Sequence, residues 1–264
     1  MSLPSHPFCV ITGAGAGFGR ALALALARRR ARLLLSDIDA DAAQETARRA
    51  LDAGAPEARS RRCDVSKLAE VEALAAACEG RIDLVVNNAG VSSGGLIGEL
   101  SIEDWRWTLD VDLWGVIHGC HVFTPRLRAQ GGGHILNVAS AAAFVAAPRM
   151  AAYNVAKAGA VSVSETLAAE LTGTGVGVTV LCPTFFKSDV VKSGRFTDEH
   201  TRNLAERMMS KGIDVEEVVR AALRAVEHDD LYCVPMTNGR WLWRLKRLAP
   251  EWYTRRLGAT TRKW

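Results

Sequence analysis

Short runs of consecutive apolar residues recur along this chain, and longer segments rich in alanine, leucine, arginine and glutamate separate them. Several runs are apolar at every position, which is typical of strands that a parallel sheet buries on both faces. The predicted strands are 8–12, 31–37, 58–65, 81–89, 133–140, 175–183 and 231–235. The predicted helices are 18–30, 40–53, 67–78, 103–129, 152–172 and 214–227. This repeated strand–helix order predicts an α/β fold with a doubly wound parallel sheet.

No linker rich in proline or serine interrupts this alternation, so we expect a single domain over residues 6–236. Two stretches depart from the pattern. Residues 184–213 interrupt the last strand–helix unit with polar and aromatic residues, as a substrate loop or lid would. Residues 237–264 form a basic, tryptophan-rich, amphipathic tail.

Composition narrows the class of protein. Hydrophobic residues make up 48% of the 264 residues, enough for a sizeable core. The formal charge of +4 is too small to indicate a nucleic-acid partner. The six cysteines contain no C-x-x-C pair, as in a reduced cytosolic protein. The start of the chain lacks the features of a secretory signal, and the most apolar window, 138–147, is shorter than the ~20 residues of a spanning helix. We therefore expect a cytoplasmic protein.

A glycine-rich turn, TGAGAGFG at 12–19, follows the first predicted strand and opens a helix. Its spacing is Gly13-x-x-x-Gly17-x-Gly19, which differs from the common G-x-G-x-x-G pattern. Glycines permit positive φ and close backbone approach, and a helix N-terminus offers free N–H groups to a pyrophosphate. A tight turn that binds nothing is the alternative, but the strand–turn–helix context favours a dinucleotide site.

Asp37 ends the second predicted strand, where a carboxylate can accept hydrogen bonds from the ribose hydroxyls of a dinucleotide. The same carboxylate would repel a 2′-phosphate, so the sequence favours NAD over NADP. Capping of the next helix is the alternative role, which we assign to Asp39. Arg20 and the pair Arg61–Arg62 could weaken this discrimination.

Two further strand ends carry polar groups. CDVS at 63–66 includes Asp64, which suits either the adenine edge or a helix cap. NNAG at 87–90 lies where ligands bind in open α/β sheets, although the four residues in isolation would by default indicate an ordinary turn.

Tyr153 and Lys157 lie one turn apart on the predicted helix 152–172. A free phenol, with a pKa of ~10, is a poor base at neutral pH, and a nearby ammonium lowers that pKa. Ser140, at the end of the fifth predicted strand, could hydrogen-bond a carbonyl or alcohol oxygen. Each residue alone has an ordinary structural reading; together they fit proton transfer beside a hydride-transferring cofactor.

The motifs TGAGAGFG, NNAG, NVAS and YNVAK, in this order, resemble those of the short-chain dehydrogenase/reductase family. The resemblance spans roughly residues 6–236 and implies a Rossmann-type sheet of about seven strands flanked by helices. It implies catalytic roles for Ser140, Tyr153 and Lys157, with Lys157 also on the nicotinamide ribose and Asn87 beside the cofactor. The expected cofactor-binding set is Gly13, Gly17, Phe18, Gly19, Asp37, Asp64, Val65, Asn87, Ala89, Tyr153, Lys157, Pro183 and Thr184.

The chain departs from the family pattern in two places. VDLWG at 111–115 has Asp112 where family members commonly carry asparagine. We include Asp112 in the catalytic set, although its carboxylate could pair with Lys157 and weaken the effect of Lys157 on the pKa of Tyr153. In CPTFFKS at 182–188, Thr184 replaces the usual glycine after Pro183.

These features predict an NAD(H)-dependent oxidoreductase that interconverts a secondary alcohol and a ketone. An NADP-dependent ketone reductase and a non-catalytic dinucleotide sensor are the alternatives. An apolar substrate is favoured by aromatic and thioether side chains in or near 184–213: Phe185, Phe186, Phe196, Met208 and Met209.

The remaining features concern partners. His118 and His121 lack further ligands for a metal, so we expect packing or subunit contacts and no metal site. Gly115 and Gly119 permit close helix approach, between subunits of a homodimer or homotetramer or within one chain.

On a helical tail, Trp241, Leu245 and Leu248 share one stripe, and Arg240, Arg244 and Arg247 share another. Packing against a subunit or over the substrate cleft is favoured over contact with a membrane surface.

Overall fold

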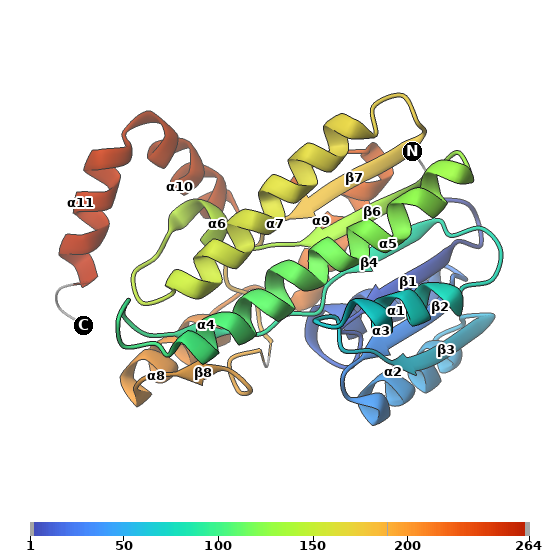
Figure 1. Cartoon of the computed structure of the whole chain (residues 1–264), viewed down its shortest axis with the longest axis horizontal. Helices are drawn as coiled ribbons and strands as arrows, with labels where there is room; N and C mark the ends of the chain where they lie inside the picture. The colour runs from blue at the N-terminus through green and yellow to red at the C-terminus, as the bar shows by residue number, and fades with distance from the viewer. Residues whose placement is uncertain (1–2, 189, 262–264) are drawn as a thin grey trace.

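Seven parallel strands form one sheet in the computed structural model, in the order β3-β2-β1-β4-β6-β7-β9 (Figure 1). The structure describes residues 3–188 and 190–261. The strands of this sheet are β1 (Phe8–Thr12), β2 (Arg32–Asp37), β3 (Glu57–Arg62), β4 (Leu84–Asn87), β6 (Gly133–Val138), β7 (Val176–Leu181) and β9 (Tyr232–Cys233). Each matches a predicted strand, and the predicted doubly wound fold is confirmed.

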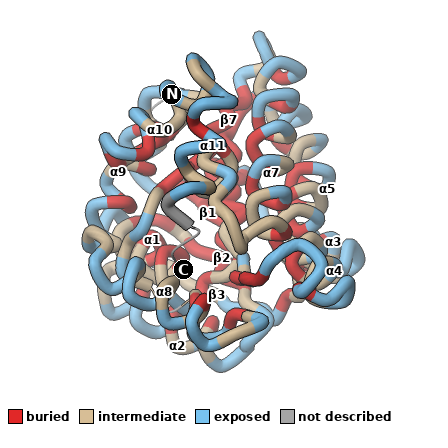
Figure 2. The backbone as a smooth tube through the Cα atoms, turned by 90° about the vertical axis from the view of Figure 1, so that its left-hand side faces the viewer, coloured by how far each residue is buried: buried red, intermediate tan, exposed pale blue. Residues whose placement is uncertain are grey.

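Helices cover both faces of the sheet. They are α1 (Gly17–Arg28), α2 (Ala40–Asp52), α3 (Leu68–Ala76), α4 (Ile102–Leu109), α5 (Gly115–Ala129), α6 (Ala142–Val145), α7 (Ala151–Glu170), α8 (Glu199–Ser210), α9 (Val215–His228), α10 (Thr237–Leu248) and α11 (Pro250–Thr261). One apolar cluster packs α3, α5 and α7 on the sheet, and a second packs α1, α2 and α9. Figure 2 shows buried residues along the labelled strands and exposed residues on the outer faces of the helices.

The inner strands are buried because their sequences are apolar at consecutive positions, whereas the edge strand β3 (EARSRR) is partly exposed. All five residues of β1 and all six of β7 are buried, so neither strand has a face in solvent. Local polar groups fix several helix starts. Asp39 caps α2 by accepting a hydrogen bond from the Ala42 N–H at 3.0 Å. Ser101 caps α4 by accepting one from the Asp104 N–H. The expected cap at Asp39 is confirmed.

A π-helical turn interrupts the predicted helix 103–129. It covers Asp110–Trp114 between α4 and α5. Such a turn adds a residue to the helical repeat and reorients the side chains on it, and it is frequent at functional sites. Asp112 is buried in this turn, whereas Asp110 is exposed.

The stretch 184–213 folds back on the body. Phe186 bridges Ile213, and β8 (Arg195–Phe196) pairs with β5 (Ser93–Gly94) before α8 begins. The tail forms α10 and α11, which lie at one end of the long axis, with α2 and β3 near the other (Figure 1). Among the described residues, no helix combines the length and the hydropathy needed to cross a bilayer.

Candidate active site

The carboxyl ends of the parallel strands lie along one edge of the sheet, and most of the polar residues singled out in the sequence follow those ends. Thr12 ends β1, Asp37 ends β2 and Asn87 ends β4. Ser140 follows β6 by two residues, and Pro183 follows β7 by two. In open α/β sheets ligands bind along this edge, at the point where the strand order reverses, here between β1 and β4.

The glycine turn between β1 and α1 has a backbone that other residues could not adopt without strain. Gly13 has φ 62° and Gly17 has φ 50°. A Cβ on Gly13 would lie 2.6 Å from the Ala89 Cα, and one on Gly19 would lie 2.3 Å from the Gly13 carbonyl oxygen. Within the described part of the chain, no side chain caps the N-terminus of α1. Its first N–H groups therefore remain available to an anion, and the turn fits a dinucleotide pyrophosphate.

Asn88 holds this turn against β4, a role that the sequence did not reveal. Its Nδ2 donates hydrogen bonds to the carbonyl oxygens of Thr12 and Gly13, both at 2.9 Å. The backbone N–H groups of Asn88 and Ala89 donate to the Thr12 hydroxyl at 3.0 and 3.2 Å. The signal was present in the NNAG motif, but spacing alone does not say which asparagine turns toward the glycines.

Asp37 lies against the glycine turn. Its Oδ2 accepts a hydrogen bond from the Gly15 N–H at 2.8 Å, and its Oδ1 accepts one from the Asp39 N–H at 3.1 Å. A Cβ on Gly15 would lie 2.8 Å from the Asp37 carboxylate. Gly15, absent from the predicted set, is thus the glycine that lets Asp37 approach the turn.

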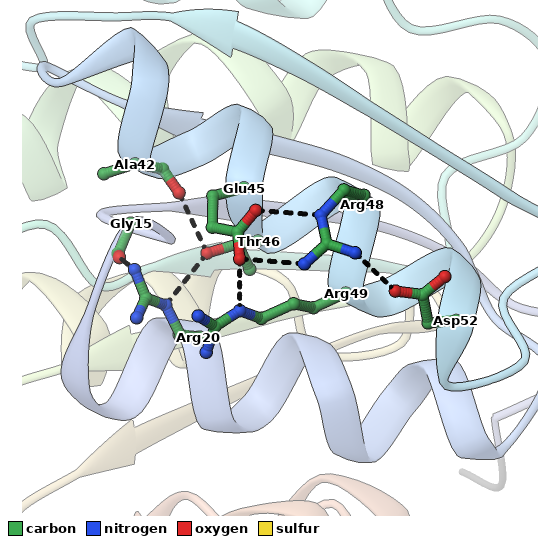
Figure 3. A network of polar contacts seen from close by, with 8 residues as sticks. All are labelled: Gly15, Arg20, Ala42, Glu45, Thr46, Arg48, Arg49 and Asp52. Carbon is green, nitrogen blue, oxygen red and sulfur yellow. Dashed lines mark hydrogen bonds and ion pairs between the residues drawn. The ribbon is translucent and has the colours of Figure 1, made fainter.

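Arg20 is the cation closest in sequence to this turn, and it has partners within the chain. Figure 3 shows its guanidinium between the Gly15 carbonyl oxygen and the Thr46 hydroxyl of α2. The Nε–Oγ1 distance to Thr46 is 3.1 Å. Arg62 is similarly engaged, since it pairs with Glu70 at 2.8 Å.

Three predicted cofactor residues have side chains that are buried or hydrogen-bonded within the chain. Phe18 is 4% exposed and packs in the apolar cluster with α1 and α9. Val65 is also buried, and its carbonyl oxygen is 2.9 Å from His118 Nδ1. Asp64 accepts hydrogen bonds from the Ser66 N–H and hydroxyl. Phe18 and Val65 therefore have only backbone atoms to offer a ligand.

Asn87 is buried in the interior instead of facing the crevice with its side chain. Its Nδ2 donates to Asn137 Oδ1 at 2.8 Å, and Asn137 in turn donates to the Ser164 hydroxyl at 2.9 Å. A Cβ on Gly119 would lie 1.9 Å from Asn87 Oδ1. Gly119 thus permits close packing of α5 on β4. The close approach at this glycine is therefore within one chain and not between subunits.

The four predicted catalytic residues come together beside the glycine turn. Tyr153 and Lys157 face the same way on α7, with Lys157 Nζ 5.5 Å from the centre of the Tyr153 ring. Ser140 lies near the phenol of Tyr153 and acts to lower its pKa. Lys157 Nζ is 3.1 Å from Asp112 Oδ2 and donates to the Val138 carbonyl oxygen at 3.2 Å.

Asp112 and Lys157 form a buried ion pair. The Asp112 side chain is 0% exposed and that of Lys157 is 4% exposed. The other carboxylate oxygen of Asp112 accepts a hydrogen bond from the Val91 N–H at 2.7 Å. The π-helical turn and the backbone after NNAG therefore hold the carboxylate in place, and the carboxylate holds the ammonium.

Burial has a larger effect on the pKa of Tyr153 than Lys157 has. Burial raises the pKa of the Tyr153 phenol, Lys157 and Ser140 act to lower it, and Asp112 raises it further. Lys157 thus acts in the expected direction, but the net pKa of Tyr153 is above its ordinary value, because burial has the larger effect. Burial would lower the pKa of Lys157, but Asp112 and Tyr153 raise it overall. Burial also raises the pKa of Asp112, against the opposing effect of Lys157.

Thr184, which follows β7, lines a cavity of about 550 Å³. Its N–H contacts Met236 Sδ at 3.4 Å, and its hydroxyl lies 3.5 Å from Asn238 Oδ1. Phe185 and Met208 also line the cavity. Phe186 instead packs against the apolar core, and Phe196 belongs to β8. The predicted apolar set is thus divided between a cavity wall and the fold.

The histidines of the long helical segment do not form a metal site. His118 contacts Val65 and lies 5.7 Å from the Trp114 ring. Across residues 3–188 and 190–261, no three His, Cys, Asp or Glu side chains are grouped to hold a metal ion.

Known proteins resemble this chain in sequence and in fold. A family model described as short chain dehydrogenase matches residues 8–199. D-threitol dehydrogenase of Mycolicibacterium smegmatis is 46% identical over 125 residues, which are 46% of this chain and 48% of that protein. The chain therefore spans about half the length of this relative.

Solved structures cover more of the chain. A short chain dehydrogenase/reductase from Burkholderia phymatum in complex with NAD superimposes with a TM-score of 0.90 at 33% identity, over 95% of this chain and 96% of that one. A short-chain dehydrogenase from Sphingobium yanoikuyae in complex with NADPH gives a TM-score of 0.79 at 25% identity, over 89% and 91% of the two chains.

Proposed function

Because this chain belongs to the short-chain dehydrogenase/reductase family, we propose that it transfers hydride between a nicotinamide dinucleotide and a secondary alcohol or ketone. One observation carries the proposal: Ser140, Tyr153, Lys157 and Asp112 converge beside an uncapped glycine turn at the carboxyl edge of the sheet. A phenol, a hydroxyl and an ammonium in this arrangement can move one proton to or from a substrate oxygen.

Each side chain has a distinct task in the proposed reaction. The bound dinucleotide supplies the hydride acceptor for oxidation and the hydride donor for reduction. The Ser140 hydroxyl donates a hydrogen bond to the substrate oxygen. The Tyr153 phenolate takes the proton from an alcohol, and the phenol returns it to a carbonyl oxygen. Lys157 stabilises the phenolate and binds ribose hydroxyls, and Asp112 keeps Lys157 charged and in position.

The dinucleotide would lie along the edge that the strand ends form. Gly13, Gly17 and Gly19 allow the pyrophosphate to reach the N-terminus of α1. Asp37 would accept hydrogen bonds from the adenosine ribose, and Asp64 would border the adenine. The remaining backbone contacts would come from Phe18, Val65, Asn87, Ala89, Pro183 and Thr184.

We further propose that the chain prefers NAD(H). The Asp37 carboxylate would lie close to any 2′-phosphate and repel it, and Arg20 already donates hydrogen bonds to Gly15 and Thr46. The complex of the Burkholderia phymatum protein with NAD supports this preference. The NADPH complex of the Sphingobium yanoikuyae protein is the reason to test it.

The Asp37→Ser variant tests the preference. Removal of the carboxylate should tighten NADPH binding at least roughly tenfold, since relief of ~1.4 kcal/mol of repulsion has that effect. NADH binding should weaken, because the ribose hydroxyls lose their acceptor. Titration of the intrinsic tryptophan fluorescence with each dinucleotide gives the four dissociation constants. A wild-type protein that binds NADPH more tightly than NADH would refute the preference.

An apolar substrate is the finer part of the proposal. The cavity beside Thr184 has apolar side chains at Phe185, Met208 and Met236 and charged ones at Lys211 and Glu217, and the four catalytic residues are not among its lining residues. The apolar part of this lining favours an apolar ligand. The experiment is NADH formation or consumption across a panel of apolar secondary alcohols and ketones, with D-threitol as the polar comparison. Apolar members should give the higher kcat/KM. Turnover of D-threitol alone would overturn the substrate class but keep the reaction, and turnover of none would favour a dinucleotide sensor.

A further inference from the structure

The net positive charge of this protein comes from its C-terminal tail. Residues 237–264 contain eight Lys or Arg and one acid, Glu251, a formal charge of +7. The whole chain carries +4, so residues 1–236 carry a formal −3. Exposed arginines in the described part of the tail include Arg244, Arg247, Arg255 and Arg256. The tail is therefore a basic surface on an otherwise slightly acidic body.

The tail is fixed to the body by a small number of specific contacts. The Trp243 ring stacks on Phe144 of α6, with ring centres 4.5 Å apart and planes 15° apart. Arg240 Nε donates to the Val234 carbonyl oxygen at 2.7 Å. The Tyr253 hydroxyl of α11 donates to the Val145 carbonyl oxygen at 3.2 Å. The two helices thus have a defined inner side.

The apolar stripe predicted from the sequence lies on another side of the tail. Trp241 is 64% exposed, Leu245 is 39% exposed and Leu248 is 85% exposed, and Trp252 of α11 is 56% exposed. Trp243, which was not part of that stripe, makes the packing contact instead. Figure 2 looks onto this end and shows exposed residues along much of α10 and α11. Large apolar side chains exposed along one stripe of a basic helix are typical of an interaction surface.

We propose that α10 and α11 dock on an anionic lipid bilayer, lying in the plane of its surface. Tryptophan and leucine side chains insert at the level of the headgroups and upper acyl chains, and arginine and lysine side chains meet the lipid phosphates. The helices have 12 residues each, so they lie on the bilayer and do not cross it. A second copy of the chain is a poorer occupant, because pairing the two stripes would bring together two tails of +7.

Co-sedimentation with vesicles tests the proposal on the whole chain. Vesicles of phosphatidylglycerol mixed with phosphatidylcholine should bind the protein, and vesicles of phosphatidylcholine alone should bind it at least tenfold more weakly. Each basic residue near an anionic surface contributes ~1 kcal/mol, so the Arg255→Gln/Arg256→Gln variant should bind roughly 30-fold more weakly. The Leu248→Ser variant should lose about tenfold or more, since it removes a leucine that inserts.

Matched controls separate docking from overall charge and general stickiness. Arg28→Gln/Arg128→Gln removes the same charge from exposed positions on α1 and α5, and it should bind as the wild type does. Ile97→Ser removes an apolar side chain that is 80% exposed on another part of the surface, and it too should have no effect. Thermal unfolding of each variant checks that the fold is intact.

Three results would overturn the proposal. One is equal binding to neutral and anionic vesicles. Another is an equal loss of binding in the charge control and in the tail variant. The last is a fall in oligomeric mass for Leu248→Ser, measured by light scattering, in a protein that binds neither kind of vesicle; that result would assign the stripe to a second copy.

Discussion

At the scale of single residues, the least usual feature of the site is the carboxylate of Asp112. Resembling proteins commonly carry asparagine at this position. Here a buried carboxylate lies 3.1 Å from Lys157 and raises the pKa of Tyr153. A pair of this kind keeps the lysine charged in a low-dielectric interior but also offsets part of its effect on the phenol. We expect this offset to appear in the pH dependence of turnover.

The Asp112→Asn variant should shift the pH profile of alcohol oxidation to lower pH. Oxidation needs the Tyr153 phenolate, so its rate rises as the pH passes through the pKa of that phenol. Burial, Asp112 and Cys182 act to raise this pKa above its ordinary value, and the substitution removes the contribution of Asp112. The measurement is kcat for NADH formation against pH, with Asp110→Asn, an exposed neighbour, as the control. An unchanged or more alkaline profile would contradict the proposed role of Asp112.

At the scale of elements, the packing of α5 on β4 depends on the absence of a side chain at Gly119. The amide of Asn87 fills the space where a Cβ would lie, at 1.9 Å from its oxygen. Asn87 in turn belongs to a buried chain of hydrogen bonds with Asn137 and Ser164. An added methyl group must displace this network or move the helix.

We therefore expect Gly119→Ala to lower the free energy of unfolding by about 1–3 kcal/mol, the usual cost of overpacking. Gly258→Ala is the control, because a Cβ at that helical position meets no atom within 4 Å. It should leave the stability unchanged or raise it slightly. Urea denaturation followed by circular dichroism gives both values. Equal stability of the two variants would show that α5 can move away from β4 at little cost.

The elements also show where prediction from sequence reached its limit. Most of the seven strands were predictable because they are short apolar runs between polar turns, whereas β3 (EARSRR) was predictable only from its place in the strand–helix alternation. The π-helical turn was not, because one extra residue within 103–129 leaves the apolar pattern nearly unchanged. The orientation of Asp112 follows from that turn, so a carboxylate near Lys157 could be anticipated but its burial and contact with Val91 could not.

At the scale of the whole molecule, the order of the strands brings distant motifs to one edge. The parallel topology places the glycine turn, Asp37, the NNAG motif and Ser140 there, as the sequence predicted. Packing between distant segments determined side-chain orientations and a pKa shift that the sequence alone did not predict. It turned Asn87 inward and Asn88 toward the glycines, and it reversed the expected shift at Tyr153. It also placed Trp243, not the predicted stripe, against the body.

The most direct test of the account is the Tyr153→Phe variant, measured for both turnover and NADH binding. Loss of the hydroxyl should lower kcat by about 10²–10⁴-fold, the usual contribution of a positioned acid or base. The dissociation constant for NADH should stay within about twofold of the wild-type value, because the glycine turn and Asp37 are untouched. Tyr232→Phe, which removes a hydroxyl bonded to Glu165, serves as the control and should keep full turnover. Undiminished turnover in Tyr153→Phe would contradict the proposed chemistry at its centre.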